Sequence, residues 1–510
     1  MRERGLHILQ ASFPLAWLLV IVLLPISSMP LIARLAGSDM VAAPSALPLI
    51  WLVVFWLIPY LFKRGTLAFP TAPFWGFVLV AILSSLAAYF LATPNLKNQS
   101  IFSREAKQLF TLAVGVCFYL VASTWPASIN RLRTTLRWIN YSGLVMLAWS
   151  LTQVYFTFVV KEYPAWMVHI QENLISVSGL FLGRTTGFAF EPSWLAHQLN
   201  MLYLPIWIAA SLVRYSAHRF KFLGISLENI LLAGGLAAMF FSYSRIGWLG
   251  LGLVAAFLLL KANIFLINLL RDLIQRNVSV RPGFRLVFTG IVTGLIALVF
   301  LAGYLGGIYG VARLGSQKDP RIAALFETPA EFSYYYINQL RFAERAVYWA
   351  AGWNIFNDHP ILGVGIGNAG FYFRQSLPPF SWQLKEITDI MNHSEIIPNT
   401  KSLWTRILAE TGLVGFSFFL AWCFLLFQTG RGLWKQKDPL LRVVGMAGMV
   451  GVVALIAEGF SVDSFALPYL WIMQGLVTAA GQQIWVTQSP TSTAPTHLDE
   501  IPAFKISKPA

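Results

Sequence analysis

Seven of the charged residues in or beside long apolar runs, where a charge is energetically expensive and needs a reason, are especially informative. Arg245 is the clearest case, because the apolar run 231–241 precedes its Ser-Tyr-Ser turn and apolar sequence resumes at Ile246. Such an arginine either extends from a helix end to the membrane surface or faces a cavity and binds an anion. The other six are Arg184, Glu191, Arg345, Lys401, Arg406 and Glu410.

Other polar residues have spacings that favour structural roles. Arg406 and Glu410 are four residues apart, so on a helix they share one face, and we expect them to neutralise each other in a partly buried helix. Glu458 and Asp463 flank a short turn, where they could cap helices or pair with cations, and the sequence leaves both open. In the segment 356–368, three glycines alternate without the dinucleotide-binding spacing, which predicts a compact turn with close backbone approach.

The composition defines the elements that must position these residues. Of 510 residues, 57% are hydrophobic and 12% are charged, whereas a soluble domain carries about 25% charged residues. This excludes a soluble enzyme, a disordered protein and a protein with a single membrane anchor. Windows long enough to span a bilayer run over 14–32, 47–62, 73–92, 109–125, 138–160, 194–213, 230–243, 247–270, 286–309, 403–427, 443–460 and 465–485. We therefore predict an all-α polytopic membrane protein with about twelve transmembrane helices, the first of them retained rather than cleaved as a signal peptide.

The basic residues predict the orientation in the membrane. With the N-terminus in the cytoplasm, every short inside loop is rich in Lys and Arg, as the positive-inside rule requires. The formal net charge of +15 is therefore a topology signal, and no nucleic-acid partner is expected. Both termini are predicted to be cytoplasmic. One outer loop is an exception, since it carries Lys97, Arg104 and Lys107 against Glu105.

The segment 310–402 is predicted to form a folded extracytoplasmic subdomain. It is too long for a plain connection, its charges are nearly balanced, and it is rich in aromatic residues. Helices are expected at 332–336 and 341–356, the second with Phe342, Ala346, Trp349 and Trp353 on one face. The predicted organisation is an N-terminal set of transmembrane helices (1–180), a second membrane domain (181–485) that includes this loop, and a disordered tail (486–510). Cys117 and Cys423 lie in apolar runs, which favours small core residues over a disulfide or metal site.

Several of these segments together resemble the bacterial O-antigen ligase/O-antigen polymerase superfamily. The resemblance lies in Glu344-Arg345-Ala-Val-Tyr-Trp349, His359-Pro360-Ile-Leu-Gly-Val-Gly365, Ile407-Leu-Ala-Glu410-Thr-Gly412-Leu-Val-Gly415 and Ser244-Arg245-Ile-Gly. The segment Arg184-Thr-Thr-Gly-Phe-Ala-Phe-Glu191-Pro192-Ser193 is similar to one seen mainly in the polymerase branch. The similarity covers roughly residues 184–480, and its specificity comes from the order of the motifs on this topology.

The resemblance implies a metal-independent glycosyltransferase of the GT-C kind that needs no cofactor. Such an enzyme takes a glycan from a polyprenyl pyrophosphate carrier at the outer face of the bacterial cytoplasmic (inner) membrane. It transfers the glycan to another carrier-linked repeat in polymerases, or to lipid A–core in ligases. Arginines matching Arg245 and Arg345 are thought to hold the pyrophosphate, and Arg184 is a further candidate. Arginine suits this role because it remains charged and its forked donors match phosphate oxygens.

One position departs from the ligase pattern. Ligases have a histidine, then Asn, Ser or Gln, then nine residues and a G-x-x-G motif. Counting back from Gly412 puts the histidine position at Lys401 and its companion at Ser402. A lysine is a poor base at neutral pH unless burial or adjacent arginines favour its neutral form, so Lys401 is either the base or a third phosphate contact. In the second case Glu191, Glu395 or His393 would accept the proton. Glu191 could equally be an N-cap before a proline at the first helical position.

The leading hypothesis is therefore a polymerase of lipid-linked oligosaccharide repeats, of the O-antigen or exopolysaccharide type. An O-antigen ligase is the alternative within the superfamily. A transporter or flippase of polyprenyl-linked sugars is the alternative from another class, since about twelve spans also suit a transporter. Broken or repeated halves, which many transporters show, are not evident in the sequence.

Overall fold

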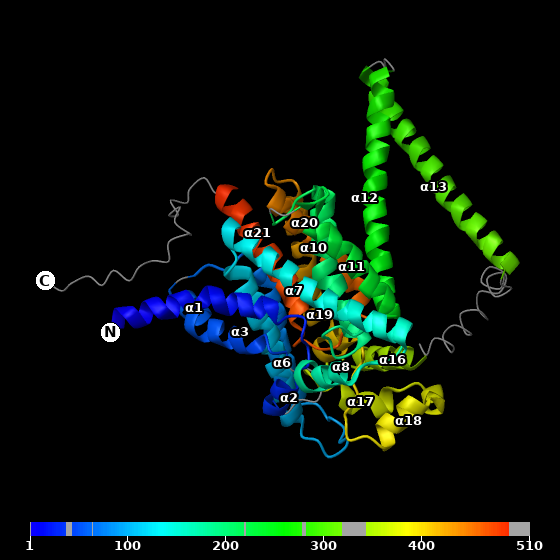
Figure 1. Ribbon diagram of the computed structural model, residues 1–510. Coiled ribbons are helices and arrows are strands. Elements are labelled where there is room, and N and C mark those ends of the chain that lie inside the picture. The colour runs from blue at the N-terminus through cyan, green and yellow to red at the C-terminus, as the bar shows by residue number, and fades with distance from the viewer. Residues whose placement is uncertain are drawn as a thin grey trace.

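The chain folds into a bundle of helices, of which a computed structural model describes residues 2–36, 43–63, 65–218, 221–277, 282–318 and 343–488 (Figure 1). The first half contains α1 (Arg2–Val22), α2 (Pro30–Ala36), α3 (Ala46–Leu52), η1 (Val53–Leu57), α4 (Ile58–Phe62), α5 (Thr71–Ala88), α6 (Ile101–Thr124), α7 (Ile129–Tyr155), η2 (Phe156–Val160), α8 (Ala165–Ile170), η3 (Gln171–Ile175), α9 (Pro192–Gln198), η4 (Leu199–Tyr203) and α10 (Leu204–Val213). The second half contains α11 (Leu227–Phe241), α12 (Arg245–Asn277), η5 (Pro282–Phe284), α13 (Arg285–Lys318), α16 (Ala343–Asp358), α17 (Ala369–Ser376), η6 (Pro379–Gln383), α18 (Lys385–Asn392), α19 (Leu403–Trp434), α20 (Pro439–Glu458) and α21 (Pro468–Gln488). Strands β1 (Lys221–Phe222) and β2 (Ile225–Ser226) form a small antiparallel hairpin between α10 and α11.

The prediction of an all-α polytopic membrane protein is confirmed. Seven helices of the described chain are long and apolar enough to cross a membrane, and three shorter apolar helices cover Leu9–Val22, Ala46–Phe62 and Leu227–Phe241. The predicted windows 194–213 and 465–485 are also helical, in α9–α10 and α21. The window 14–32 is interrupted, because α1 ends at Val22 and α2 begins with Pro30, a residue that suits only the first turn of a helix.

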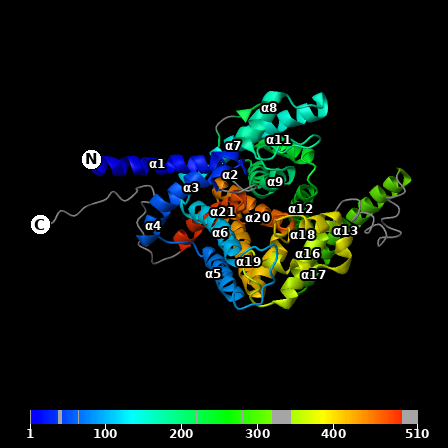
Figure 2. The ribbon, with the colours of Figure 1, turned by 90° about the horizontal axis from the view of Figure 1, so that it is seen from below.

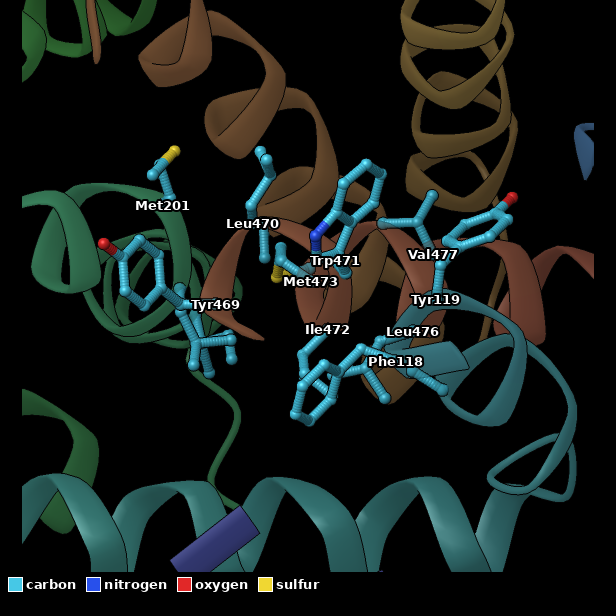
Figure 3. Packing of buried hydrophobic residues seen from close by; sticks show 14 of the residues in the cluster. Phe118, Tyr119, Met201, Tyr469, Leu470, Trp471, Ile472, Met473, Leu476 and Val477 are labelled. Carbon is cyan, nitrogen blue, oxygen red and sulfur yellow. The ribbon is translucent and has the colours of Figure 1, made fainter. Parts of the chain in front are cut away.

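Helix α20 lies at the centre of the bundle, and 83% of its apolar window is buried. Around it, aromatic side chains of α5, α6, α19 and α21 pack together, with Phe74 contacting Tyr119, Trp422 and Trp471. Figure 3 shows how residues of α21 meet Phe118 and Tyr119 of α6. By contrast, only 6% of the window in α12 is buried, as expected for a helix whose sides contact lipid. Helices α12 and α13 leave the bundle as a V-shaped pair (Figure 1).

Residues 343–402 form a subdomain at one end of the bundle, which we call the subdomain end. It has its own apolar core, built from α16, α17 and α18 and separate from the core of the membrane helices. The predicted helix 341–356 is confirmed from Ala343 onward, whereas 332–336 lies outside the described residues. Its buried face differs from the expected one, because Val347, Tyr348, Ala351 and Ile355 are buried and Trp353 is 50% exposed.

A break in α19 attaches this subdomain to the membrane helices. Gly412 has φ 62° and ψ −166°, which interrupts the helical hydrogen bonds. The freed groups pair with the glycine-rich turn instead, because Val364 N–H donates to Ala409 O and Gly365 N–H donates to Glu410 O, both at 3.0 Å. Leu413 N–H donates to Pro360 O at 2.8 Å. The predicted close backbone approach of this turn is confirmed.

Two of the three cations in the exceptional outer loop, Lys97 and Arg104, also attach the subdomain to the membrane helices. The Lys97 ammonium donates to the carbonyls of Ile390 and Ile396, the second at 2.7 Å. Arg104 Nε donates to Gly367 O at 2.8 Å. Partial burial lowers the pKa of Lys97, while the nearby Glu395 carboxylate opposes this shift. The hydrogen bonds of Lys97 and Arg104 to the subdomain therefore explain why two cations lie in an outer loop, against the positive-inside rule.

Replacing Lys97 by methionine is expected to loosen α18 and the segment after it. A hydrogen bond from a charged group typically contributes about 1.5–3 kcal/mol, and the substitution removes two such bonds. Limited proteolysis between residues 378 and 396 should become several-fold faster. Lys107→Met is the matched control, because Lys107 is exposed on the adjacent helix. Equal cleavage rates in both variants would contradict the attachment.

Candidate functional site

Arg245 extends from a tight turn that Arg184 holds in place. The turn joins α11 to α12, and Tyr243 within it has a φ of 48°. Arg184 Nε donates to Ser242 O at 3.0 Å and its Nη2 donates to Tyr243 O at 3.3 Å, while Thr185 N–H donates to Phe241 O. Arg245 itself is exposed and has no side-chain hydrogen bond within the described parts of the chain. The guanidinium of Arg245 is therefore free to contact a ligand.

Electrostatics link Arg184 to its neighbours. Burial lowers the pKa of the Arg184 guanidinium, the Glu191 carboxylate opposes that shift, and the charge of Arg245 adds to it. The Arg184 guanidinium is thus within electrostatic range of both other charges.

Arg345 and Lys401 meet at Tyr348. Arg345 Nη1 donates to Ser461 Oγ at 3.2 Å, and Lys401 Nζ lies 5.8 Å from the centre of the Tyr348 ring. The Tyr348 hydroxyl donates to Glu386 Oε1 at 3.0 Å. Burial and the charge of Glu386 raise the pKa of Tyr348, and Arg345 opposes this shift. Lys401 has a φ of 52°, so its backbone turns sharply just before α19 begins.

The turn 458–461, at the end of α20, connects these cations. Arg345 binds Ser461, and Leu403 N–H, two residues after Lys401, donates to Gly459 O at 2.7 Å. On the other side, the Glu458 carboxylate contacts Asn200, whose Nδ2 also donates to Gly247 O at 2.7 Å, two residues after Arg245. Arg245, Arg345 and Lys401 therefore lie at the same end of the bundle. Figures 1 and 2 agree, since the start of α12 lies next to α16.

Glu458 belongs to a buried polar cluster that the sequence did not predict as a site. Its carboxylate is fully buried and pairs with Nδ1 of His197, which is 1% exposed. Asn200 donates to the other carboxylate oxygen. The Glu458 side chain thus bonds to a buried histidine and an amide, and no bond to an arginine or lysine is found for it within the described residues. The signal in the sequence was the polar pair His197 and Asn200 inside the apolar window 194–213.

The candidate proton acceptors differ in their surroundings. Glu191 is half-buried at the N-cap of α9, but its side chain makes no capping hydrogen bond and accepts one from Ser193 Oγ instead. His393 is 74% exposed and lies 3.6 Å from Asp389, and no contact joins it to the three arginines within the described residues. Glu395 is exposed. Of these three, Glu191 is the one whose charge acts on Arg184.

Arg406 and Glu410 are a structural pair. Their side chains are 6% and 4% exposed, with Arg406 Nε 3.0 Å from Glu410 Oε2, which confirms the expected neutralisation. Arg406 also donates to Gln108 Oε1 at 2.7 Å and to the carbonyl of Asp463. Each of its three guanidinium nitrogens therefore donates a hydrogen bond: one within α19, one to α6 and one to the segment before α21.

Fold and site together define a multi-pass helical membrane protein. At its subdomain end lie Arg245, Arg345 and Lys401, which we call the cationic cluster. Residues 230–420 match the family model described as O-antigen ligase, and this match supports the O-antigen ligase/polymerase superfamily that the sequence resembles. The matched segment contains Arg245, Arg345 and Lys401, whereas Arg184, Glu191, His197 and Glu458 lie outside it. The function to be expected is thus of the membrane glycan ligase or polymerase kind. A search of curated proteins found no match to the chain.

Proposed function

We propose that this protein is a membrane glycosyltransferase that polymerises polyprenyl-pyrophosphate-linked oligosaccharide repeats at the outer face of the bacterial inner membrane. The observation that carries the proposal is the common location of Arg245, Arg345 and Lys401 around the turn 458–461. Three cations from distant parts of the chain, at one end of a membrane bundle, suit the diphosphate head group of a lipid. The positive-inside pattern of the opposite loops supports an outer location for this end.

Two chemical tasks follow from the reaction. The bond from the sugar anomeric carbon to the carrier diphosphate breaks, and a bond from that carbon to the acceptor hydroxyl oxygen forms. The negative charge that develops on the departing diphosphate is stabilised by Arg245 and Arg345, because guanidinium donors match phosphate oxygens. The proton of the acceptor hydroxyl goes to Glu191, whose carboxylate is not used in capping. The carrier diphosphate is the second product.

The choice of acceptor separates two candidates. A polymerase is supported by Lys401 at the position of the ligase histidine and by the segment 184–193. An O-antigen ligase, which would use lipid A–core as the acceptor, is favoured by the match of residues 230–420 to the O-antigen ligase family model. We propose the polymerase because the residue that departs from the ligase pattern lies within the cationic cluster.

Reconstitution with defined substrates tests the proposal. Purified protein in nanodiscs is given a synthetic polyprenyl diphosphate-linked repeat, with and without lipid A–core. Products that grow by whole repeats on the carrier support the polymerase. Transfer only in the presence of lipid A–core identifies a ligase. In sealed vesicles, movement of the lipid-linked repeat across the bilayer without a new glycosidic bond would identify a transporter.

Lys401 is expected to contact phosphate rather than to act as the base. Its position over the Tyr348 ring favours the charged ammonium, because a ring face attracts cations. Lys401→Arg should therefore keep at least a third of the polymerisation rate, while Lys401→Ala should lose roughly 10- to 100-fold, as a weakened transition-state contact would. Measured rates of repeat addition check this expectation. A complete loss in Lys401→Arg, which retains charge but cannot accept a proton, would instead identify Lys401 as the base.

A further inference from the structure

The cluster formed by His197, Glu458 and Asn200 has no role in the proposed chemistry. Glu458 and His197 are 0% and 1% exposed, so neither can reach a hydroxyl of the glycan acceptor without a rearrangement. Burying a charged group is costly unless it is paired and hydrogen-bonded, and here both carboxylate oxygens have partners. The cluster is therefore fully hydrogen-bonded, and its position next to α12 indicates what else it could do.

The cluster lies directly against the first turns of α12. Asn200 Nδ2 donates to the carbonyl of Gly247, near the start of α12. Asn200, which also binds Glu458, therefore links α12 to the Glu458 carboxylate. A Cβ atom at Gly250 would lie 2.6 Å from Glu458 Oε1 and 2.8 Å from Asn200 Nδ2. At Gly250, α12 therefore approaches the cluster more closely than a residue with a Cβ atom would allow.

Glu458 is also the first residue of the turn 458–461, which binds Arg345. Ser461 N–H donates to Glu458 O at 2.9 Å, and the Ser461 hydroxyl accepts from Arg345. One residue thus contacts the helix of Arg245 through its side chain and the hydroxyl partner of Arg345 through its backbone. A shift of Glu458 would change the separation of the two arginines.

We propose that His197, Glu458 and Asn200 are positioning residues that set the spacing of Arg245 and Arg345 for a diphosphate. This inference rests on the proposed function, because it assumes that both arginines bind one lipid diphosphate. A ligand with two phosphates needs two cations at a defined separation, whereas a monophosphate can be held by one. The cluster therefore determines selectivity for a diphosphate over a monophosphate.

Two glycines of α12 provide a matched test. Gly250→Ala places a methyl group against the fixed Glu458 carboxylate, whereas Gly252→Ala, on the same helix, meets nothing within 4 Å. Binding of undecaprenyl diphosphate and undecaprenyl monophosphate is titrated with full-length protein in nanodiscs. We expect Gly250→Ala to weaken diphosphate binding at least fivefold and monophosphate binding less than twofold. Gly252→Ala should change neither by more than twofold.

A double substitution shows whether the effect passes through Arg245. In an Arg245→Ala background, Gly250→Ala should weaken diphosphate binding by less than a further twofold. If Gly250→Ala weakens diphosphate binding as strongly in the Arg245→Ala background as in the wild type, the inference is overturned and the proposed function stands. The same conclusion follows if Gly250→Ala and Gly252→Ala bind the diphosphate equally well. If Arg245→Ala by itself binds the diphosphate as the wild type does, the proposed function falls as well.

Glu458→Gln is the second variant, because glutamine keeps the size of the side chain and removes its charge. It is expected to reduce the preference for diphosphate over monophosphate at least threefold at an unchanged amount of folded protein. If neither Gly250→Ala nor Glu458→Gln yields folded protein, the cluster serves folding and the positioning role is rejected.

Discussion

Replacing Arg245 or Arg345 by alanine should lower the rate of glycosidic bond formation roughly 10²–10³-fold, the usual loss for one group that stabilises charge in a transition state. Arg245 is exposed and without a side-chain hydrogen bond in the described structure, and Arg345 binds only the hydroxyl of Ser461 there. Neither residue is needed to fill the core. The amount of membrane-inserted protein should therefore remain unchanged. The measurement is the rate of repeat addition with a synthetic lipid-linked substrate.

Arg271→Ala is the control for loss of a positive charge. Arg271 lies on the same helix as Arg245, near its other end, where it pairs with Asp272 at 2.8 Å. Removal of this exposed pair should cost less than about 1 kcal/mol and leave the rate within twofold of the wild type. Wild-type rates in Arg245→Ala and Arg345→Ala would remove the basis of the proposed function.

Substitution of Gly412 by alanine is expected to have the largest effect on stability. With φ at 62° and ψ at −166°, the residue occupies a region that side chains rarely adopt, which costs about 1–3 kcal/mol. The added Cβ would also lie 2.6 Å from the backbone nitrogen of Leu362, which cannot move without opening the turn that pairs with α19. We expect a total loss of about 3 kcal/mol or more, seen as a lower unfolding temperature in detergent and faster proteolysis of the subdomain.

Gly432→Ala in the same helix is the control, because it shows how much stability changes when a glycine with ordinary helical surroundings is replaced by alanine. The nearest atom to a Cβ at Gly432 is 3.8 Å away, and alanine favours helices by about 1 kcal/mol over glycine. This variant should be as stable as the wild type or slightly more stable. Equal unfolding temperatures for Gly412→Ala and Gly432→Ala would show that the break in α19 does not require glycine.

The sequence by itself determined the membrane architecture and the candidate cations. A span is recognised from about 20 consecutive apolar residues, and orientation follows from basic residues in short loops, so both are local properties. The same reasoning singled out Arg245, because one charge between apolar runs is conspicuous without any neighbour being known. The spacing of Arg406 and Glu410 was sufficient to predict their ion pair, because residues four apart on a helix lie on the same face whatever the tertiary structure.

Only the tertiary structure decided which distant groups meet. His197 and Glu458 are 261 residues apart in the chain, and nothing in either local sequence indicates the other. Lys97 and Arg104 broke the charge rule because they bind carbonyl groups 299 and 263 residues away. Gly412 lies inside an apolar run that reads as one continuous helix, yet the turn 360–365 replaces its internal hydrogen bonds. Hydrophobic periodicity shows that a helix forms, but the contacts between helices depend on how complementary surfaces pack, and that information is spread over the whole chain.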